Sequence, residues 1–299
     1  MLTLFTLPKA FRGHIGTIQR NAILSWKQLC PQPQIILLGD EDGIADIARA
    51  QGLQHVPRIA KNEFGTPLMS DAFAEARRLA TYDIFCYINA DILLLGNFLD
   101  AVERVSREFD KFLAVSKRVN VNIAQPIDFH TGWEAQFRKD CVARGTLAPD
   151  TCIDVFVFPR TTFARVPAFA IGRLWFDHWF IRAARKAGLP VVELSPSSPV
   201  IHQNHDYNHV QGSIEAIWLS QESQRNLKLY GKVLHDYTLS DATHQLLPDG
   251  QIEELPPPKR SQPLRYLLWE VLVQNTFALR QRFGLRRENF RTLAARWRR

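Results

Sequence analysis

Acids and imidazoles that could hold a metal ion follow apolar segments of this chain. Asp91 comes shortly after the apolar run 84–88, and His202, His205 and His209 stand within eight residues. Divalent metals take carboxylate oxygen and imidazole nitrogen together. A carboxylate at the end of a buried strand must be paired, hydrogen-bonded or bound to a metal. We therefore interpret Asp91 and at least one of these histidines as a candidate metal site.

A metal ion that keeps open positions binds the diphosphate of a nucleotide and offsets the charge that builds on a departing phosphate. A separate carboxylate could then take the proton from an attacking hydroxyl. Asp177 is a candidate because the pattern places it at the start of a helix over 174–187. Asp154 stands inside an apolar strand over 152–159, where it either contacts substrate or is a hydrogen-bonded structural carboxylate.

Each of these residues also has a purely structural interpretation. Asn89 and Asp91 are typical of a turn that closes a strand. Asp177 is a favourable charge at a helix N-terminus. The histidines could belong to a hydrated loop. The residues taken one at a time leave both interpretations open, so the order of the elements has to be considered.

The first hundred residues alternate strand and helix patterns. This alternation predicts parallel βαβ units, hence an α/β fold with a Rossmann-like, mostly parallel central sheet flanked by helices. Parallel sheets bind ligands at the carboxyl ends of their strands, which is where Asp91 falls. Residues 120–149 show no clear pattern. The expected strands are 2–7, 34–38, 53–59, 84–88, 112–116, 152–159 and 191–194, and the expected helices are 13–29, 44–51, 71–80, 97–109 and 174–187.

Several protein classes are disfavoured by what the sequence lacks. No G-x-G-x-x-G follows the first strand and no G-x-x-x-x-G-K-[ST] occurs, which argues against a dinucleotide-binding dehydrogenase and a P-loop ATPase. The four cysteines show no C-x-x-C spacing, so we expect a reducing, cytoplasmic location. We find no signal peptide pattern and no apolar window of about 20 residues that would span a membrane.

The order of these features resembles the nucleotide-diphospho-sugar glycosyltransferases of the GT-A fold, over about residues 1–215. In that family the last Asp of a D-x-D motif binds manganese or magnesium on the donor diphosphate, and Asp91 matches it. Asn89 stands where the first Asp usually stands, which implies that it bonds the ribose or a water on the metal. The helix-start acid, the base of inverting members, matches Asp177, and the C-terminal histidine ligand matches His202 or His205.

The resemblance also implies contacts to the nucleotide near the ends of the first two strands. These fall on Thr6 and Asp40, with Asn62 and Asp71 as further candidates. The implied reaction moves a sugar from a UDP- or GDP-linked donor to a hydroxyl of a glycan or a lipid-linked acceptor. A sugar nucleotidyltransferase is the alternative enzyme, but it would carry a Gly-rich loop in place of residues 7–13, where one glycine stands.

The basic charge of the chain is concentrated in its C-terminal tail. The net charge is +7, and residues 259–299 alone carry +9, which leaves −2 for the rest. We expect a glycosyltransferase-like domain over 1–255 and a basic amphipathic helical tail over 256–299. The tail either contacts the anionic inner face of a membrane or packs on the domain. Contact with the membrane would contribute about 1 kcal/mol of binding free energy per basic residue. A non-catalytic membrane or RNA adaptor is the other class of function, although no nucleic acid is expected because no known binding module accompanies the charge.

Overall fold

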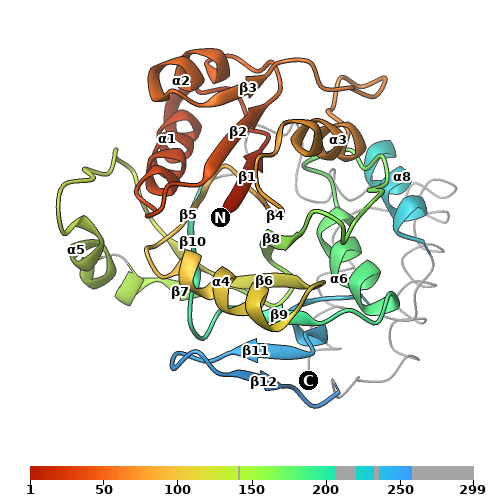
Figure 1. The fold of residues 1–299 in the computed structure, drawn as a ribbon. Helices are drawn as coiled ribbons and strands as arrows, with labels where there is room; N and C mark the ends of the chain where they lie inside the picture. Colours follow the sequence, from red (N-terminus) through yellow and green to blue (C-terminus); the bar gives the residue numbers. More distant parts are fainter. Residues whose placement is uncertain (141, 206–219, 232–235, 258–299) are drawn as a thin grey trace, which may run out of the picture. The chain divides into compact units, whose positions relative to one another are not determined.

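The computed structural model describes residues 1–140, 142–205, 220–231 and 236–257. All of them except Asp236 belong to one compact unit. Its centre is a mixed sheet in the order β12-β11-β9-β6-β8-β4-β1-β2-β3 (Figure 1). The strands are β1 Leu2–Thr6, β2 Gln34–Leu38, β3 Gln54–Val56, β4 Ile84–Ile88, β5 Ile92–Leu93, β6 Leu113–Val121, β7 Thr146–Leu147, β8 Ile153–Pro159, β9 Val191–Glu193, β10 Val200–Gln203, β11 His244–Leu246 and β12 Ile252–Glu254.

The first four strands of the main sheet confirm the predicted parallel arrangement. β1 lies parallel to both β2 and β4, and β2 lies parallel to β3. β1 is buried along its whole length, and β2 and β4 are buried except at their first residues. These apolar runs form strands because both faces of the sheet are covered, which removes the need for alternating polar positions.

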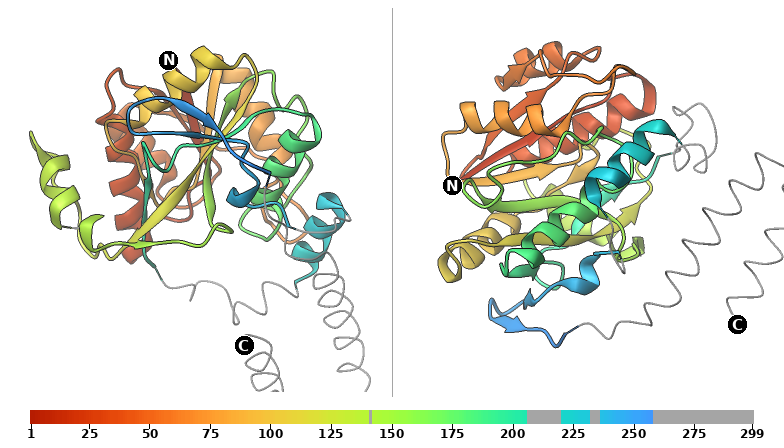
Figure 2. Two further views of the ribbon diagram at one scale, coloured as in Figure 1. Left: turned by 90° about the horizontal axis from the view of Figure 1, so that it is seen from below. Right: turned by 90° about the vertical axis from the view of Figure 1, so that its right-hand side faces the viewer.

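The helices cover the two faces of this sheet (Figure 2). Trp26 of α1, Ala48 of α2 and Val105 of α4 pack in one cluster with Leu4 and Cys86 of the strands. The helices are α1 Gly13–Lys27, α2 Ile44–Gln51, α3 Met69–Leu79, α4 Phe98–Glu108, α5 Trp133–Asp140, α6 Phe176–Lys186 and α8 Gln221–Tyr230, with short 3₁₀ turns at Val142–Arg144 and Leu239–Asp241.

The opposite face of the sheet is packed with aromatic rings. Phe73 of α3 stacks on Phe158 of β8 with ring centroids 5.8 Å apart, and on Phe180 of α6 at 5.4 Å. Tyr87 of β4 lies beside Phe156 at 6.1 Å. These large buried rings hold α3 and α6 against β4 and β8, so the start of α6 is placed rigidly over the sheet.

β8 runs antiparallel to both of its neighbours, β4 and β6. β6 is longer than the predicted strand 112–116: its first half pairs with β8 and β9, and its second half pairs with β7 and β10. A register shift between Val115 and Lys117 marks the bend between the two halves. Beyond this bend β6 pairs with β10. β10 in turn pairs with β5, the strand that begins directly after Asp91.

Other parts of the fold had no counterpart in the sequence prediction. The unassigned stretch 120–149 contains α5 and β7, and α8, β11 and β12 follow beyond residue 219. The tail predicted for 256–299 lies outside the described residues from 258 onward, so its helix and its membrane contact stay predictions. In the part of the chain that the structure describes, no helix combines the length and apolarity that a membrane span requires.

Candidate metal and donor site

Asp91 and two of the three predicted histidines meet where β4 ends. β10 pairs antiparallel with β5, in a register that sets His202 opposite Ile92. This places His202 Nε2 3.8 Å and His205 Nε2 3.1 Å from Asp91 Oδ2. His209 lies outside the described residues. The sheet therefore brings together residues that are more than a hundred positions apart.

The three side chains fit a divalent cation. Their ligand atoms all lie within 4.8 Å of one another. Neighbouring ligands of an octahedral Mg²⁺ or Mn²⁺, with bonds of about 2.1 Å, are themselves roughly 3 Å apart. Asp91 Oδ1 is buried and has no hydrogen-bond partner among the described residues. An ion in this place would satisfy that oxygen, which otherwise carries a desolvation cost.

The electrostatics of the cluster also suit metal binding. Burial by itself would raise the pKa of Asp91, but the hydrogen bond with His205 and the charges of His202, His205 and Lys9 lower it to about 2. Burial lowers the pKa of His202. The lowered pKa of His202 favours the neutral imidazole, and a bound cation would take the place of the imidazolium charges in keeping Asp91 ionised.

A buried amide network holds the strand ends that carry these ligands. Gln203 donates from its backbone N–H and from Nε2 to the Asp91 carbonyl, both at 3.2 Å. Its Nε2 also donates to Ile18 O at 2.7 Å, and its Oε1 accepts from Asn21 Nδ2 at 3.0 Å. The sequence analysis missed Asn21 and Gln203. The available signal was a polar residue within an otherwise apolar strand or helix face.

Asn89 is engaged with the neighbouring strand. Its Nδ2 donates to Asp154 Oδ1 at 2.7 Å, and Arg118 Nη1 donates to Asp154 Oδ2 at the same distance. The side chains of Arg118 and Asp154 are only 13% and 10% exposed. Asp154 is thus hydrogen-bonded within the protein, as expected for a structural carboxylate. In this structure it positions Asn89 two residues before Asp91.

Asp177 lies in the first turn of α6, and its carboxylate is partly buried. Burial raises its pKa; the nearby His178 lowers it, and the charge of Asp154 adds to the rise. Burial also raises the pKa of Tyr87, and the charges of Asp154, Asp91 and Asp177 all add to that rise. Phe176, the residue before Asp177, lies with its ring centroid 6.3 Å from that of Tyr87, so the start of α6 lies beside the end of β4.

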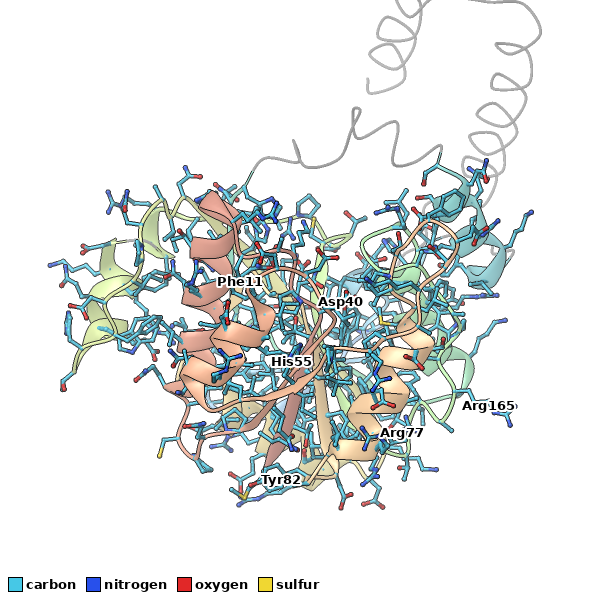
Figure 3. All side chains as sticks on the ribbon, turned by 90° about the horizontal axis from the view of Figure 1, so that it is seen from above. Phe11, Asp40, His55, Arg77, Tyr82 and Arg165 are labelled. Atoms are coloured by element: carbon cyan, nitrogen blue, oxygen red, sulfur yellow. The ribbon has the colours of Figure 1, made fainter. Side chains whose placement is uncertain are left out.

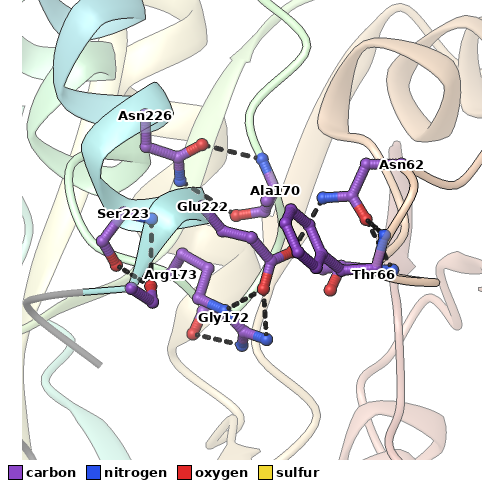
Figure 4. A network of polar contacts seen from close by, with 10 residues as sticks. Asn62, Thr66, Ala170, Gly172, Arg173, Glu222, Ser223 and Asn226 are labelled. Atoms are coloured by element: carbon purple, nitrogen blue, oxygen red, sulfur yellow. Dashed lines mark hydrogen bonds and ion pairs between the residues drawn. The ribbon is translucent and has the colours of Figure 1, made fainter. Parts of the chain in front are cut away.

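The loop that leads into α6 is fixed by α8 (Figure 4). Asn226 accepts from Ala170 N at 2.9 Å and donates to Ala170 O and Leu174 O at 3.0 Å. The next residue, Trp175, is the one described non-glycine residue with positive φ, at 84°. A left-handed conformation at a bulky residue is strained, so it needs surrounding contacts of this kind.

Glu222 of α8 joins this loop to a second one. Its side chain is 7% exposed, pairs with Arg173 at 2.7 Å and accepts from Asn62 Nδ2 at 2.7 Å. Asn62 Oδ1 in turn accepts from Phe64 N and Thr66 N at 3.0 Å. Asn62 therefore organises the 62–66 loop. Its predicted contact to a nucleotide stays a prediction.

Three donor-binding candidates remain. Thr6 and Asp40 lie at the carboxyl ends of β1 and β2, and Asp71 lies in the first turn of α3. Thr6 ends β1, and its hydroxyl is buried without a partner among the described residues. Asp40 follows β2 and pairs with Lys61 Nζ at 2.6 Å. Asp71 accepts from Ala60 N at 2.7 Å. Thr6 is fully buried, and its contact to a nucleotide stays a prediction; Asp40 and Asp71 are engaged within the protein.

Comparisons with known proteins support the fold. The chain matches TarS 1–349 of S. aureus in complex with UDP-GlcNAc at a TM-score of 0.50 and 10% identity, covering 77% of this chain and 65% of that one. It matches GalNAc-T7 with UDP, GalNAc and Mn²⁺ at a TM-score of 0.48 and 14% identity, covering 76% and 47%. A putative glucose-1-phosphate thymidylyltransferase from Bacillus anthracis matches at 0.43 and 13%, covering 78% and 96%.

The match to TarS, at a TM-score of 0.50, confirms a GT-A-like α/β fold, as the resemblance predicted. The chain spans less than two thirds of the length of the two glycosyltransferase structures. No protein-family model matches the sequence. No curated protein matches it either.

Proposed function

We propose that this protein is a metal-dependent glycosyltransferase that moves a sugar from a UDP- or GDP-linked donor to a hydroxyl of a glycan or lipid-linked acceptor. The observation that supports it best is the convergence of Asp91, His202 and His205 at the carboxyl end of β4, on a GT-A-like sheet. In an open α/β sheet, ligands bind at the carboxyl ends of the strands.

Asp91, His202 and His205 would hold Mn²⁺ or Mg²⁺. When bound, the ion neutralises charge on the donor diphosphate as the sugar leaves. Asn89 lies beside this group, held by Asp154, and would orient the ribose or a water on the ion. Thr6, whose hydroxyl is unpartnered in the described part of the chain, is a candidate for a nucleotide contact at the end of β1.

Asp177 would act as the base if the reaction inverts configuration at the sugar. Its carboxylate would accept the proton of the acceptor hydroxyl as that oxygen attacks the sugar. Burial raises the pKa of Asp177, which makes it a stronger base than an exposed aspartate. In a retaining reaction the base role is not required, and Asp177 or Asp154 would have another role.

Calorimetry with UDP and GDP sugars, with and without Mn²⁺, tests the proposal. We expect one nucleotide sugar to bind only with the metal, and Asp91→Ala to abolish that binding. Asp110→Asn, at an exposed acid in the turn after α4, is the matched control and should bind like the wild type. Undiminished metal-dependent binding and transfer by Asp91→Ala would overturn the site.

A further inference from the structure

A groove lies between α3 and the chain that follows β8. Its volume is about 550 Å³. Four arginines line it, from both sides: Arg77 and Arg78 from α3, and Arg160 and Arg165 from beyond β8. A groove of this size is within the range of about 300–1,000 Å³ that holds small molecules.

This groove is separate from the Asp91 site. β8 pairs antiparallel with β4, so Pro159 lies opposite Ile84, at the start of β4, whereas Asp91 follows its end. Figure 3 shows Arg77 and Arg165 toward the end of the molecule marked by Tyr82, away from Asp40. The arginines that follow β8 therefore lie at the amino end of β4, whereas the proposed sugar donor lies at its carboxyl end.

The positive charge of the groove is not neutralised within the described residues. Arg77 Nη2 donates to Phe163 O at 2.6 Å, and Arg160 Nη2 donates to Arg77 O at 2.7 Å. Neither of them, nor Arg165, forms an ion pair with a carboxylate of the described residues, whereas Arg78 pairs with Glu75 at 2.7 Å. Each guanidinium has five N–H donors, so these backbone bonds leave most of them available.

Helix capping accounts for only part of this arrangement. A cation near a helix C-terminus is favourable, and the bond from Arg160 to Arg77 O serves that role for α3. It does not require a second guanidinium beside Arg160 or a third at Arg165. Burial lowers the pKa of Arg77, and the charge of Arg160 lowers it further. The second effect is a repulsion between the two cations. An anion between them would relieve that repulsion.

We propose that this groove binds a phosphate-bearing ligand, with Arg77 and Arg160 contacting the phosphate and Arg165 at the rim. Planar guanidinium groups form paired, charge-assisted hydrogen bonds with phosphate oxygens. Ala74 and Val166 provide an uncharged wall for the rest of the ligand. The phosphate belongs either to a soluble molecule or to a lipid head group.

Calorimetry with pyrophosphate in EDTA tests the groove without the metal-dependent donor site. We expect wild-type protein to bind pyrophosphate and the Arg77→Gln/Arg160→Gln variant to bind at least tenfold more weakly. Ala74→Glu, on the exposed side of α3, adds a carboxylate to the groove without removing a hydrogen bond and should weaken binding as well. Arg49→Gln, an exposed arginine of α2, is the control for loss of charge and should bind like the wild type.

Absence of pyrophosphate binding by the wild type, or equal binding by wild type and Ala74→Glu, would overturn the proposal. Asp91→Ala should retain pyrophosphate binding in EDTA, so failure of the donor site leaves this test intact. Flotation with phosphatidylglycerol vesicles distinguishes the sources, when both proteins carry glutamine in place of the eleven basic residues of 259–299 so that the tail does not contribute to vesicle binding. Loss of vesicle binding in the Ala74→Glu variant assigns the phosphate to a lipid, and vesicle binding equal to wild type assigns it to a soluble ligand.

Discussion

His205 Nε2 lies 3.1 Å from Asp91 Oδ2, although 114 residues separate them in the chain. The contact exists because β10 pairs with β5, immediately after Asp91, and the chain leaves β10 on the same side. The centroids of the His202 and His205 rings are 5.5 Å apart, and the Nε2 atoms of both lie within 3.8 Å of the same oxygen of Asp91. This arrangement underlies the first prediction.

Replacing either His202 or His205 by alanine should weaken Mn²⁺ binding by more than tenfold, because each removes one of three protein ligands. Outer-shell changes around metals already cost about 10–100-fold in affinity. His130→Ala, an exposed histidine outside the cluster, should leave Mn²⁺ affinity unchanged. Calorimetric titration with MnCl₂ measures all three, and equal affinities would show that the histidines are not ligands.

If the reaction inverts configuration, changing Asp177 to Asn should lower transfer by about 10²–10⁴-fold, the usual contribution of a general base. Donor and Mn²⁺ binding should persist, because Asp177 is not among the proposed ligands. Steady-state kinetics and calorimetry on the same preparation separate the two effects. Loss of donor binding together with activity would instead place Asp177 in the donor site.

The same variant should be more stable than the wild type at neutral pH. The folded pKa of Asp177 is raised above its ordinary value of 3.8, so ionisation costs more in the folded protein than in the unfolded chain. This cost is absent at a pH below both pKa values and complete above the folded pKa. The gain in melting temperature of Asp177→Asn should therefore shrink as the pH falls toward 3.8. A constant gain would contradict this explanation.

Changing Asn89 to Asp would create the D-x-D pattern, but we expect it to destabilise the protein. Asn89 donates to Asp154, and an aspartate there would lose the donor and place two carboxylates together. Asn122→Asp is the matched control, because Asn122 accepts from Asn204 and an aspartate can do the same. Thermal unfolding at pH 7 should show a lower melting temperature for Asn89→Asp only.

Changing Gln203 to Leu should cost about 1–3 kcal/mol of stability, the penalty for leaving buried polar partners unsatisfied. Asn21 and Ile18 O would lose a partner in the interior, and the Asp91 carbonyl would keep only the backbone bond. Gln245→Leu, whose amide bonds Glu253 on an exposed edge, should cost much less. Urea denaturation measures both, and comparable losses would show that the buried amide network contributes little.

Changing Glu222 to Ala should cost about 1–3 kcal/mol, because Arg173 and Asn62 would lose their shared partner. Glu103→Ala removes an exposed ion pair with Arg107, which contributes about 0.5 kcal/mol or less. Transfer by Glu222→Ala should also fall, since Arg173 lies in the loop that leads to Asp177. A stability loss no larger than that of Glu103→Ala would show that this network is not needed.

Local pattern was enough to predict the first half of the fold. The apolar runs of β1, β2 and β4 alternate with amphipathic helices, and such runs are typical of a sheet covered on both faces. The same pattern placed Asp91 at a strand end and Asp177 at a helix start. These features depend on neighbours in the chain, so the residues themselves carry the information.

The antiparallel β8, the bend in β6 and the choice of ligands were decided by long-range pairing. Nothing local in 153–159 reports strand direction, and nothing near His202 reports that it lies opposite Ile92. The amides of Asn21 and Gln203 gain their roles only when α1 and β10 meet. The sequence by itself determined which side chains could bind a cation, and the tertiary structure decided which of them meet, because strand pairing sets their distance in space.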